Sequence, residues 1–281
     1  MKPNDDVRHE VAKAYEKAVT RPAASSCCCC GPVQKGAVVG SAGYRPEELG
    51  TLPADAVVNS FGCGNPVVMA GIGPGEVVLD LGAGAGIDLF LASERVGQSG
   101  RVIGVDMTPA MIAKARANIA AGGYTNVEVR EGIIEDLPVK SETVDWVISN
   151  CVINLSPEKH RVFAEIARVL KPGGRMMVSD IVAKDLPADV RADRALFTSC
   201  VAGAISEEEY LDGLLKAGLI DATVRERLVY DAAQLEAFFH GDNGEGGCCG
   251  GPAVDAPTVA AAARRMVGKV WSAKFFARKP A

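Results

Sequence analysis

The chain has 281 residues, of which 48% are hydrophobic and 23% are charged, a composition typical of globular proteins that excludes a wholly disordered chain. Its 30 Lys and Arg residues against 35 Asp and Glu residues give a net charge of −5, and without a concentrated basic patch we expect no nucleic-acid partner. Because no stretch of about 20 apolar residues occurs and the start lacks an apolar core, we expect a cytoplasmic protein with no membrane contact. We also expect a monomer.

Two segments precede the part of the chain with regular strand and helix patterns. Apolar residues recur at helical spacing in residues 5–20, which predicts an amphipathic helix with one face to bury. Residues 21–50 are rich in Pro, Ser, Gly and Cys and are expected to be mostly loop. We therefore predict an N-terminal region, 1–50, made of a helix and a Cys-rich flexible segment.

Short apolar runs then alternate with helical patterns, and this alternation is typical of α/β folds. It predicts a doubly wound, Rossmann-like parallel sheet in a domain spanning residues 51–182, with a short helix at 53–60 and a Gly-rich turn at 62–66 before the first strand. Strands are expected at 77–81, 101–106, 127–130, 144–149 and 175–182, and helices at 87–96, 109–121 and 157–170.

The pattern loosens in residues 183–281, which are predicted to form a C-terminal α+β annex that completes the sheet. A Ser at position 206 and a Glu at 209 form a capping box at the start of one of its helices. Helices are expected at 188–200 and 206–217, a strand at 223–230, and a last, antiparallel strand at 267–277.

A glycine-rich loop, Asp80-Leu81-Gly82-Ala83-Gly84-Ala85-Gly86, joins the first strand to the next helix. Glycines there permit a tight turn and a close approach of the backbone to a ligand. The Asp80 carboxylate would repel a nearby phosphate but suits a ligand with an ammonium group. The loop therefore favours S-adenosylmethionine over NAD, with backbone contacts predicted at Gly82, Ala83, Gly84 and Gly86.

Three later segments complete the predicted cofactor site at the carboxyl edge of the sheet. Asp106 ends the second strand, where an acidic side chain can accept hydrogen bonds from both ribose hydroxyls, and Met107 is expected to lie along the adenine. Ile134 and Glu135, after the third strand, are predicted near the adenine edge. Asn150 ends the fourth strand and is expected to face the crevice in which open sheets bind ligands.

On these residues, the sequence resembles the class I S-adenosylmethionine-dependent methyltransferases over roughly residues 53–182. The resemblance implies the cofactor and says little about the methyl acceptor, because one fold hosts many functions.

The three isolated cysteines suggest the acceptor. Cys151 directly follows Asn150, Cys63 lies in the Gly-rich turn before the first strand, and Cys200 follows a predicted helix after the fifth strand. All three segments can reach the same edge of the sheet. Thiolates, with neither a His nor an organised carboxylate base beside them, suit a soft acceptor such as trivalent arsenic. Its lone pair can attack the methyl group without a general base.

The resemblance then narrows to the arsenite (arsenic(III)) S-adenosylmethionine methyltransferases, in the motifs Phe61–Pro66, Asp80–Gly86, Ser149–Leu155 and Ser199–Ala204. It implies that Cys151 and Cys200 hold arsenic, with Cys63 as third ligand and as disulfide partner during turnover. It also implies arsenite or its thiol conjugates as substrate, methyl- and dimethylarsenicals as products, thioredoxin or glutathione as reductant, and a role in arsenic detoxification.

The role of the clustered cysteines stays open. Cys27–Cys30 and Cys248–Cys249 are either mobile thiols that capture arsenite or relay electrons, or exposed thiols without a catalytic role. Tyr15, on the first predicted helix, is expected either to fold over the cofactor or to pack in the core.

Two other functions remain as alternatives. A methyltransferase of the same fold acting on an organic molecule, such as a quinone or sterol, would leave the three cysteines dispensable. A thiol-rich metal-binding or redox protein would bind metal without forming S-adenosylhomocysteine.

Overall fold

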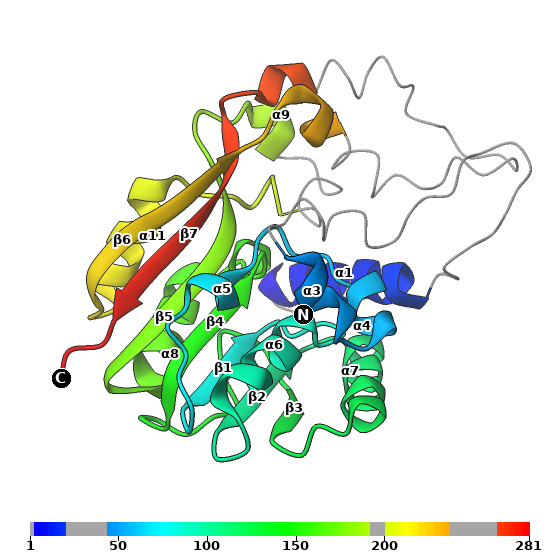
Figure 1. Cartoon of the computed structure of the whole chain (residues 1–281). Helices are drawn as coiled ribbons and strands as arrows, with labels where there is room; N and C mark the ends of the chain where they lie inside the picture. The colour runs from blue at the N-terminus through cyan, green and yellow to red at the C-terminus, as the bar shows by residue number, and fades with distance from the viewer. Residues whose placement is uncertain (1–2, 21–43, 192–199, 237–262) are drawn as a thin grey trace, which may run out of the picture.

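Seven strands form one sheet in a computed structural model that describes residues 3–20, 44–191, 200–236 and 263–281. The strands are β1 (Val77–Leu81), β2 (Arg101–Asp106), β3 (Val127–Glu131), β4 (Val144–Asn150), β5 (Leu170–Ala183), β6 (Ile220–Val229) and β7 (Val270–Arg278). Their order across the sheet is β3-β2-β1-β4-β5-β7-β6 (Figure 1).

The first five strands pair in parallel, whereas β7 runs antiparallel to β5 and β6 antiparallel to β7. The sequence of β1, Val-Val-Leu-Asp-Leu, is buried at its last four positions. Such continuous burial is typical of parallel strands covered on both faces. The predicted α/β, doubly wound fold and the antiparallel direction of the last strand are confirmed. Strand β7 does not close the sheet, however, because it lies between β5 and β6, and β6 forms the edge.

Helices cover both faces of the sheet. Val78 and Trp146 pack on one face with α6 (Ile87–Val96) and α7 (Pro109–Gly122). Leu79 and Val147, one position further along β1 and β4, pack on the other face with α8 (Lys159–Val169) and α11 (Glu207–Lys216). Successive side chains along each strand point to opposite faces of the sheet and so form two separate apolar layers. The ends of the parallel strands remain available for a site.

Some element boundaries differ from the predicted ones. Helices α3 (Pro46–Gly50) and α5 (Pro66–Met69) lie where loop and turn were predicted, because each has a Pro in its first turn, where the fixed φ of proline favours helix. Strand β5 begins at Leu170 rather than at residue 175, since Leu170 pairs with Val144 across a register shift and Gly173 adopts a φ of 77°.

Further elements are α1 (Pro3–Thr20), α4 (Ala54–Val58), the 3₁₀ helix η1 (Ile153–Leu155) and α9 (Ala188–Arg191), and residues 232–236 and 263–266 are also helical. Helices α1 and α4 both contact α7. Most of the helix predicted at 188–200, together with Cys27–Cys30 and Cys248–Cys249, lies outside the described residues. Within the described part, no helix has both the length and the apolar character that crossing a bilayer requires.

Candidate active site

A cleft with about 950 Å³ of empty space, part of it open to solvent, lies at the carboxyl ends of β1, β2 and β4. Nearly all the residues predicted to bind the cofactor line it: Asp80, Gly82, Ala83, Gly84, Asp106, Met107, Ile134, Glu135 and Asn150. Gly86 does not line the cleft. It is the N-cap of α6 with a φ of 105°, and a Cβ there would lie 2.9 Å from the ring of Phe90. Its role is therefore to turn the chain and admit close packing.

Buried negative charge dominates one wall of the cleft. Asp80 is buried at the end of β1, and this burial, together with the charges of Asp88 and Asp106, raises the pKa of Asp80 well above its ordinary value. A cation placed beside this carboxylate would relieve both the desolvation and the repulsion. The site is therefore suited to a positively charged ligand.

The carboxylate of Asp106 is fixed between the glycine loop and the end of β2. Its Oδ2 accepts a hydrogen bond from the backbone N–H of Gly84 at 2.9 Å, and its Oδ1 accepts one from that of Thr108 at 2.8 Å. Burial nevertheless raises the pKa of Asp106 above its ordinary value. Met107, partly buried, lies next to it in the cleft wall.

Asn150 connects the cofactor cleft to the turn that carries Cys63. Its Nδ2 lies 2.8 Å from the Tyr44 hydroxyl, 2.5 Å from the Gly64 carbonyl oxygen and 3.1 Å from Oδ2 of Asp88. Its Oδ1 accepts a hydrogen bond from the Gly64 N–H at 3.1 Å. This amide therefore holds the cysteine turn against β4.

Two residues of this network, Tyr44 and Asp88, were not predicted from the sequence. The Tyr44 hydroxyl donates a hydrogen bond to Asp88 at 2.8 Å, and burial raises the pKa of Asp88 to about 6, although the hydrogen bonds of Asn150 and Tyr44 oppose the rise. The one available signal for Asp88 was an acid two positions after the glycine loop, which also fits an ordinary helix start. Tyr44 lies within the segment 21–50 that was predicted as loop, and no pattern marked it.

The three isolated cysteines meet beside the cleft. Cys63 and Cys151 form a disulfide with a Cα–Cα distance of 5.8 Å, although 88 positions separate them in the sequence. The Cys200 thiol, which is not part of this disulfide, donates a hydrogen bond to the Cys151 carbonyl oxygen at 2.8 Å. All three are buried, and Cys151 itself lines the cleft. The fold thus places three sulfur-bearing side chains in one cluster.

The backbone around these cysteines is unusual. Cys151 has a φ of 60° and Cys200 a φ of 66°, in the left-handed region that side chains other than glycine rarely adopt. Such conformations cost about 1–3 kcal/mol and concentrate at functional sites. Cys63 lies between Gly62 and Gly64. A Cβ at Gly64 would lie 1.9 Å from Oγ of Ser179, so only glycine lets the turn approach β5 this closely.

In this disulfide-bonded form, the described residues contain no group of three His, Cys, Asp or Glu side chains arranged to hold a metal ion. The disulfide explains this, because it occupies the sulfur atoms of both Cys63 and Cys151. Reduction of that bond would free two thiols next to the thiol of Cys200.

Helix α1 forms part of the cleft wall through Arg8, Val11 and Tyr15. The Tyr15 ring packs edge-on against Phe61 with 5.8 Å between centroids. Both roles expected for Tyr15 are thus compatible, since it lines the cleft and also packs against the apolar cluster that contains the cysteines. Glu135 is buried and contacts α1 through Arg8.

Comparison with known proteins gives concordant results. The methyltransferase domain family matches residues 72–218. An arsenite methyltransferase of Halobacterium salinarum is 51% identical over 177 residues, which cover 63% of this chain and 45% of that protein. The human arsenite methyltransferase is 35% identical over 173 residues, which cover 58% of this chain and 46% of its own length.

A crystal structure of an arsenic(III) S-adenosylmethionine methyltransferase from Chlamydomonas reinhardtii superposes with a TM-score of 0.62 at 33% identity, covering 87% of this chain and 73% of the other. The chain thus spans about half the length of the curated arsenite methyltransferases and most of this structural relative.

Proposed function

Because the chain belongs to the methyltransferase domain family, we propose that it transfers the methyl group of S-adenosylmethionine to trivalent arsenic bound by Cys63, Cys151 and Cys200. The observation that carries this proposal is the convergence of the three buried cysteines, one of which lines the cleft. The arsenite methyltransferases among its relatives support arsenic as the acceptor.

The cleft offers a partner for each part of the cofactor. The buried Asp80 is suited to the ammonium group of the methionine moiety, and Asp106 to the ribose hydroxyls. Met107, Ile134 and Glu135 line the side of the cleft where the adenine would lie. The sulfonium would then face Cys151.

The reaction follows from the electron pair of As(III). Three thiolates bind arsenic and leave its lone pair free to attack the methyl carbon, and the carbon–sulfur bond breaks with its electrons going to sulfur, giving S-adenosylhomocysteine. The methylated arsenic is then formally As(V) and carries a positive charge. Loss of two of its thiolate ligands as a disulfide returns two electrons to arsenic and regenerates As(III), which then binds a hydroxide or a thiolate.

The Cys63–Cys151 disulfide supports this second step, because it is the product that such an elimination leaves. An external dithiol or glutathione would reduce it by thiol–disulfide exchange. The proposal therefore includes thioredoxin or glutathione as reductant, a reducing compartment such as the cytoplasm, a monomer, and arsenic detoxification as the role.

The test is incubation of the reduced protein with S-adenosylmethionine, arsenite and a thiol, followed by chromatography of methylarsenicals. We expect methylarsenicals from the unmodified chain and none from Cys151→Ser or Cys200→Ser. Retained binding of S-adenosylhomocysteine by both variants would show that they still fold. Unchanged product from both variants would refute the arsenic site. Absence of methylarsenicals from an unmodified chain that binds S-adenosylmethionine would favour an organic acceptor, and arsenite binding without S-adenosylhomocysteine formation would favour a binding or redox protein.

A further inference from the structure

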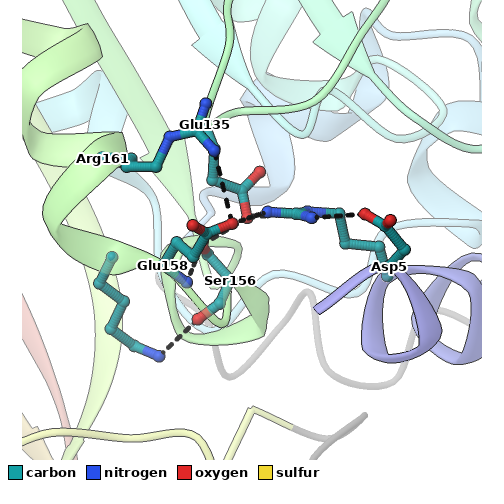
Figure 2. A network of polar contacts seen from close by, with 7 residues as sticks. Asp5, Glu135, Ser156, Glu158 and Arg161 are labelled. Carbon is teal, nitrogen blue, oxygen red and sulfur yellow. Dashed lines mark hydrogen bonds and ion pairs between the residues drawn. The ribbon is translucent and has the colours of Figure 1, made fainter. Parts of the chain in front are cut away.

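A buried ionic cluster joins α1 to the wall of the cleft. Arg8 donates to Oε1 of Glu135 through Nε at 3.2 Å and Nη2 at 3.1 Å, and Nη2 lies 2.5 Å from Oε2 of Glu158. The Arg8 side chain is only 13% exposed and that of Glu135 only 3%. Figure 2 shows Asp5, Glu135, Ser156 and Glu158 gathered where α1 meets the loops of the domain.

All the hydrogen bonds that described residues make to the Glu135 carboxylate use the same oxygen. Besides the two bonds from Arg8, Oε1 accepts a hydrogen bond from the Ser156 hydroxyl at 2.6 Å. Arg8, Glu135 and Ser156 all line the cleft. With Oε1 engaged by three donor atoms, Oε2 keeps its full capacity to accept a hydrogen bond.

Charge balance in the cluster also depends on Arg8. Two carboxylates, those of Glu135 and Glu158, contact the same Nη2 atom, at 3.1 and 2.5 Å. Without the guanidinium, these like charges would face each other, and the Glu135 carboxylate would turn away from Glu158. That rotation would remove a fixed acceptor from the cleft wall.

We propose that Arg8 is a positioning residue for purine recognition: it fixes Oε1 of Glu135, so that Oε2 accepts a hydrogen bond from the exocyclic amino group of adenine. This inference rests on the proposed S-adenosylmethionine site and does not require the arsenic chemistry. Docking of α1 and binding of the adenine are then coupled, because the Glu135 carboxylate contacts both Arg8 of α1 and the ligand.

The test compares the affinities for S-adenosylhomocysteine and S-inosylhomocysteine, which differ in the amino or oxo group of the purine. A fixed carboxylate acceptor favours the amino form and repels the oxo form. We expect the unmodified chain to prefer S-adenosylhomocysteine. This preference should fall about tenfold in Arg8→Gln, because the hydrogen bond from adenine to the charged carboxylate is weakened when that carboxylate is no longer held in place.

Two further variants make the comparison specific. Glu135→Gln should also lose the preference, because an amide can accept from adenine and donate to the oxo form, and the double variant should lose no more than either single one. Arg161→Gln is the matched control, since Arg161 contacts Glu158 at 3.5 Å from the exposed side, with 46% of its side chain exposed. Arg161→Gln should keep the full preference.

A second measurement uses the unmodified chain and so does not depend on whether the variants fold. Hydrogen exchange of residues 3–20 should slow when the unmodified chain binds S-adenosylhomocysteine and slow less with the inosyl compound. Equal weakening of both ligands in Arg8→Gln, with the preference unchanged, would assign Arg8 a purely structural role and overturn the inference. Absence of binding to either ligand in the unmodified chain would overturn the cofactor proposal as well, whereas binding without arsenic methylation would refute only the proposed acceptor.

Discussion

Replacing Gly62 by alanine tests whether the turn that carries Cys63 depends on its contact with Asn150. A Cβ at Gly62 would lie 2.2 Å from Nδ2, 2.4 Å from Cγ and 2.7 Å from Oδ1 of Asn150. Real Cβ atoms do not come this close, so the amide group must move. It cannot move freely, because it is hydrogen-bonded to Tyr44, Gly64 and Asp88.

Two costs add up in this variant. Overpacking of a well-packed site costs about 1–3 kcal/mol. Loss of the two hydrogen bonds between Asn150 and Gly64 adds about 1 kcal/mol each. The free energy of unfolding should fall by roughly 3–5 kcal/mol, which lowers the melting temperature of a domain of this size by roughly 6–20 °C.

The assay is thermal and denaturant unfolding of Gly62→Ala, together with its rate of arsenite methylation, which should fall because Cys63 shifts away from Cys151. Gly50→Ala is the control, since a Cβ there meets nothing within 4 Å. If Gly62→Ala melted with the control and methylated arsenite at the unmodified rate, the argument from Asn150 would be wrong.

Three other changes have defined outcomes. Asp80→Asn should weaken S-adenosylmethionine binding at least about tenfold in calorimetric titration. The same change should raise the free energy of unfolding, because it removes a buried carboxylate whose pKa is raised by burial. Tighter binding of S-adenosylmethionine would contradict the role of the Asp80 charge. Burial raises the pKa of Asp180 to about 7, so the native state binds this proton more tightly than the unfolded state and stability falls as pH rises between about 4 and 7. Asp180→Asn should flatten that pH dependence, and an unchanged slope in denaturant titrations would refute the assignment. The Cys63–Cys151 disulfide joins residues 88 positions apart. Its reduction should lower the free energy of unfolding of the unmodified chain by about 4 kcal/mol, whereas reductant should not destabilise Cys63→Ser. Equal effects of reductant on both chains would show that the stabilisation lies elsewhere.

Local patterns were sufficient to predict the fold and most of the cleft. The segment from Asp80 to Gly86 begins in the buried strand β1 and leads into α6, and this arrangement alone fixes where a ligand binds in an open parallel sheet. Asp106 and Asn150 were predictable for the same reason, since each ends a strand at the same edge. Gly86 shows the limit of such patterns, because its positive φ and its packing on Phe90 concern the turn rather than a ligand.

Contacts between distant segments were not predictable from the sequence. The hydrogen bond of Asn150 with Tyr44 joins residues 106 positions apart, and that of Arg8 with Glu135 joins residues 127 apart. Nothing in the local pattern around these four residues indicates the partner of any of them, because each partner lies in a distant segment. The sequence likewise gave no sign of the left-handed backbone at Cys151, which depends on how the turn after β4 packs.

The most direct measurement is the number of sulfur neighbours of bound arsenic, obtained by X-ray absorption at the arsenic edge. A chain in which Cys27–Cys30 and Cys248–Cys249 are replaced by serine keeps only Cys63, Cys151 and Cys200. Reduced and given one equivalent of arsenite, it should show three sulfur neighbours per arsenic, and two when Cys200 is also replaced by serine. Arsenic surrounded by oxygen, or three sulfur neighbours retained after that replacement, would contradict a single site built from these cysteines.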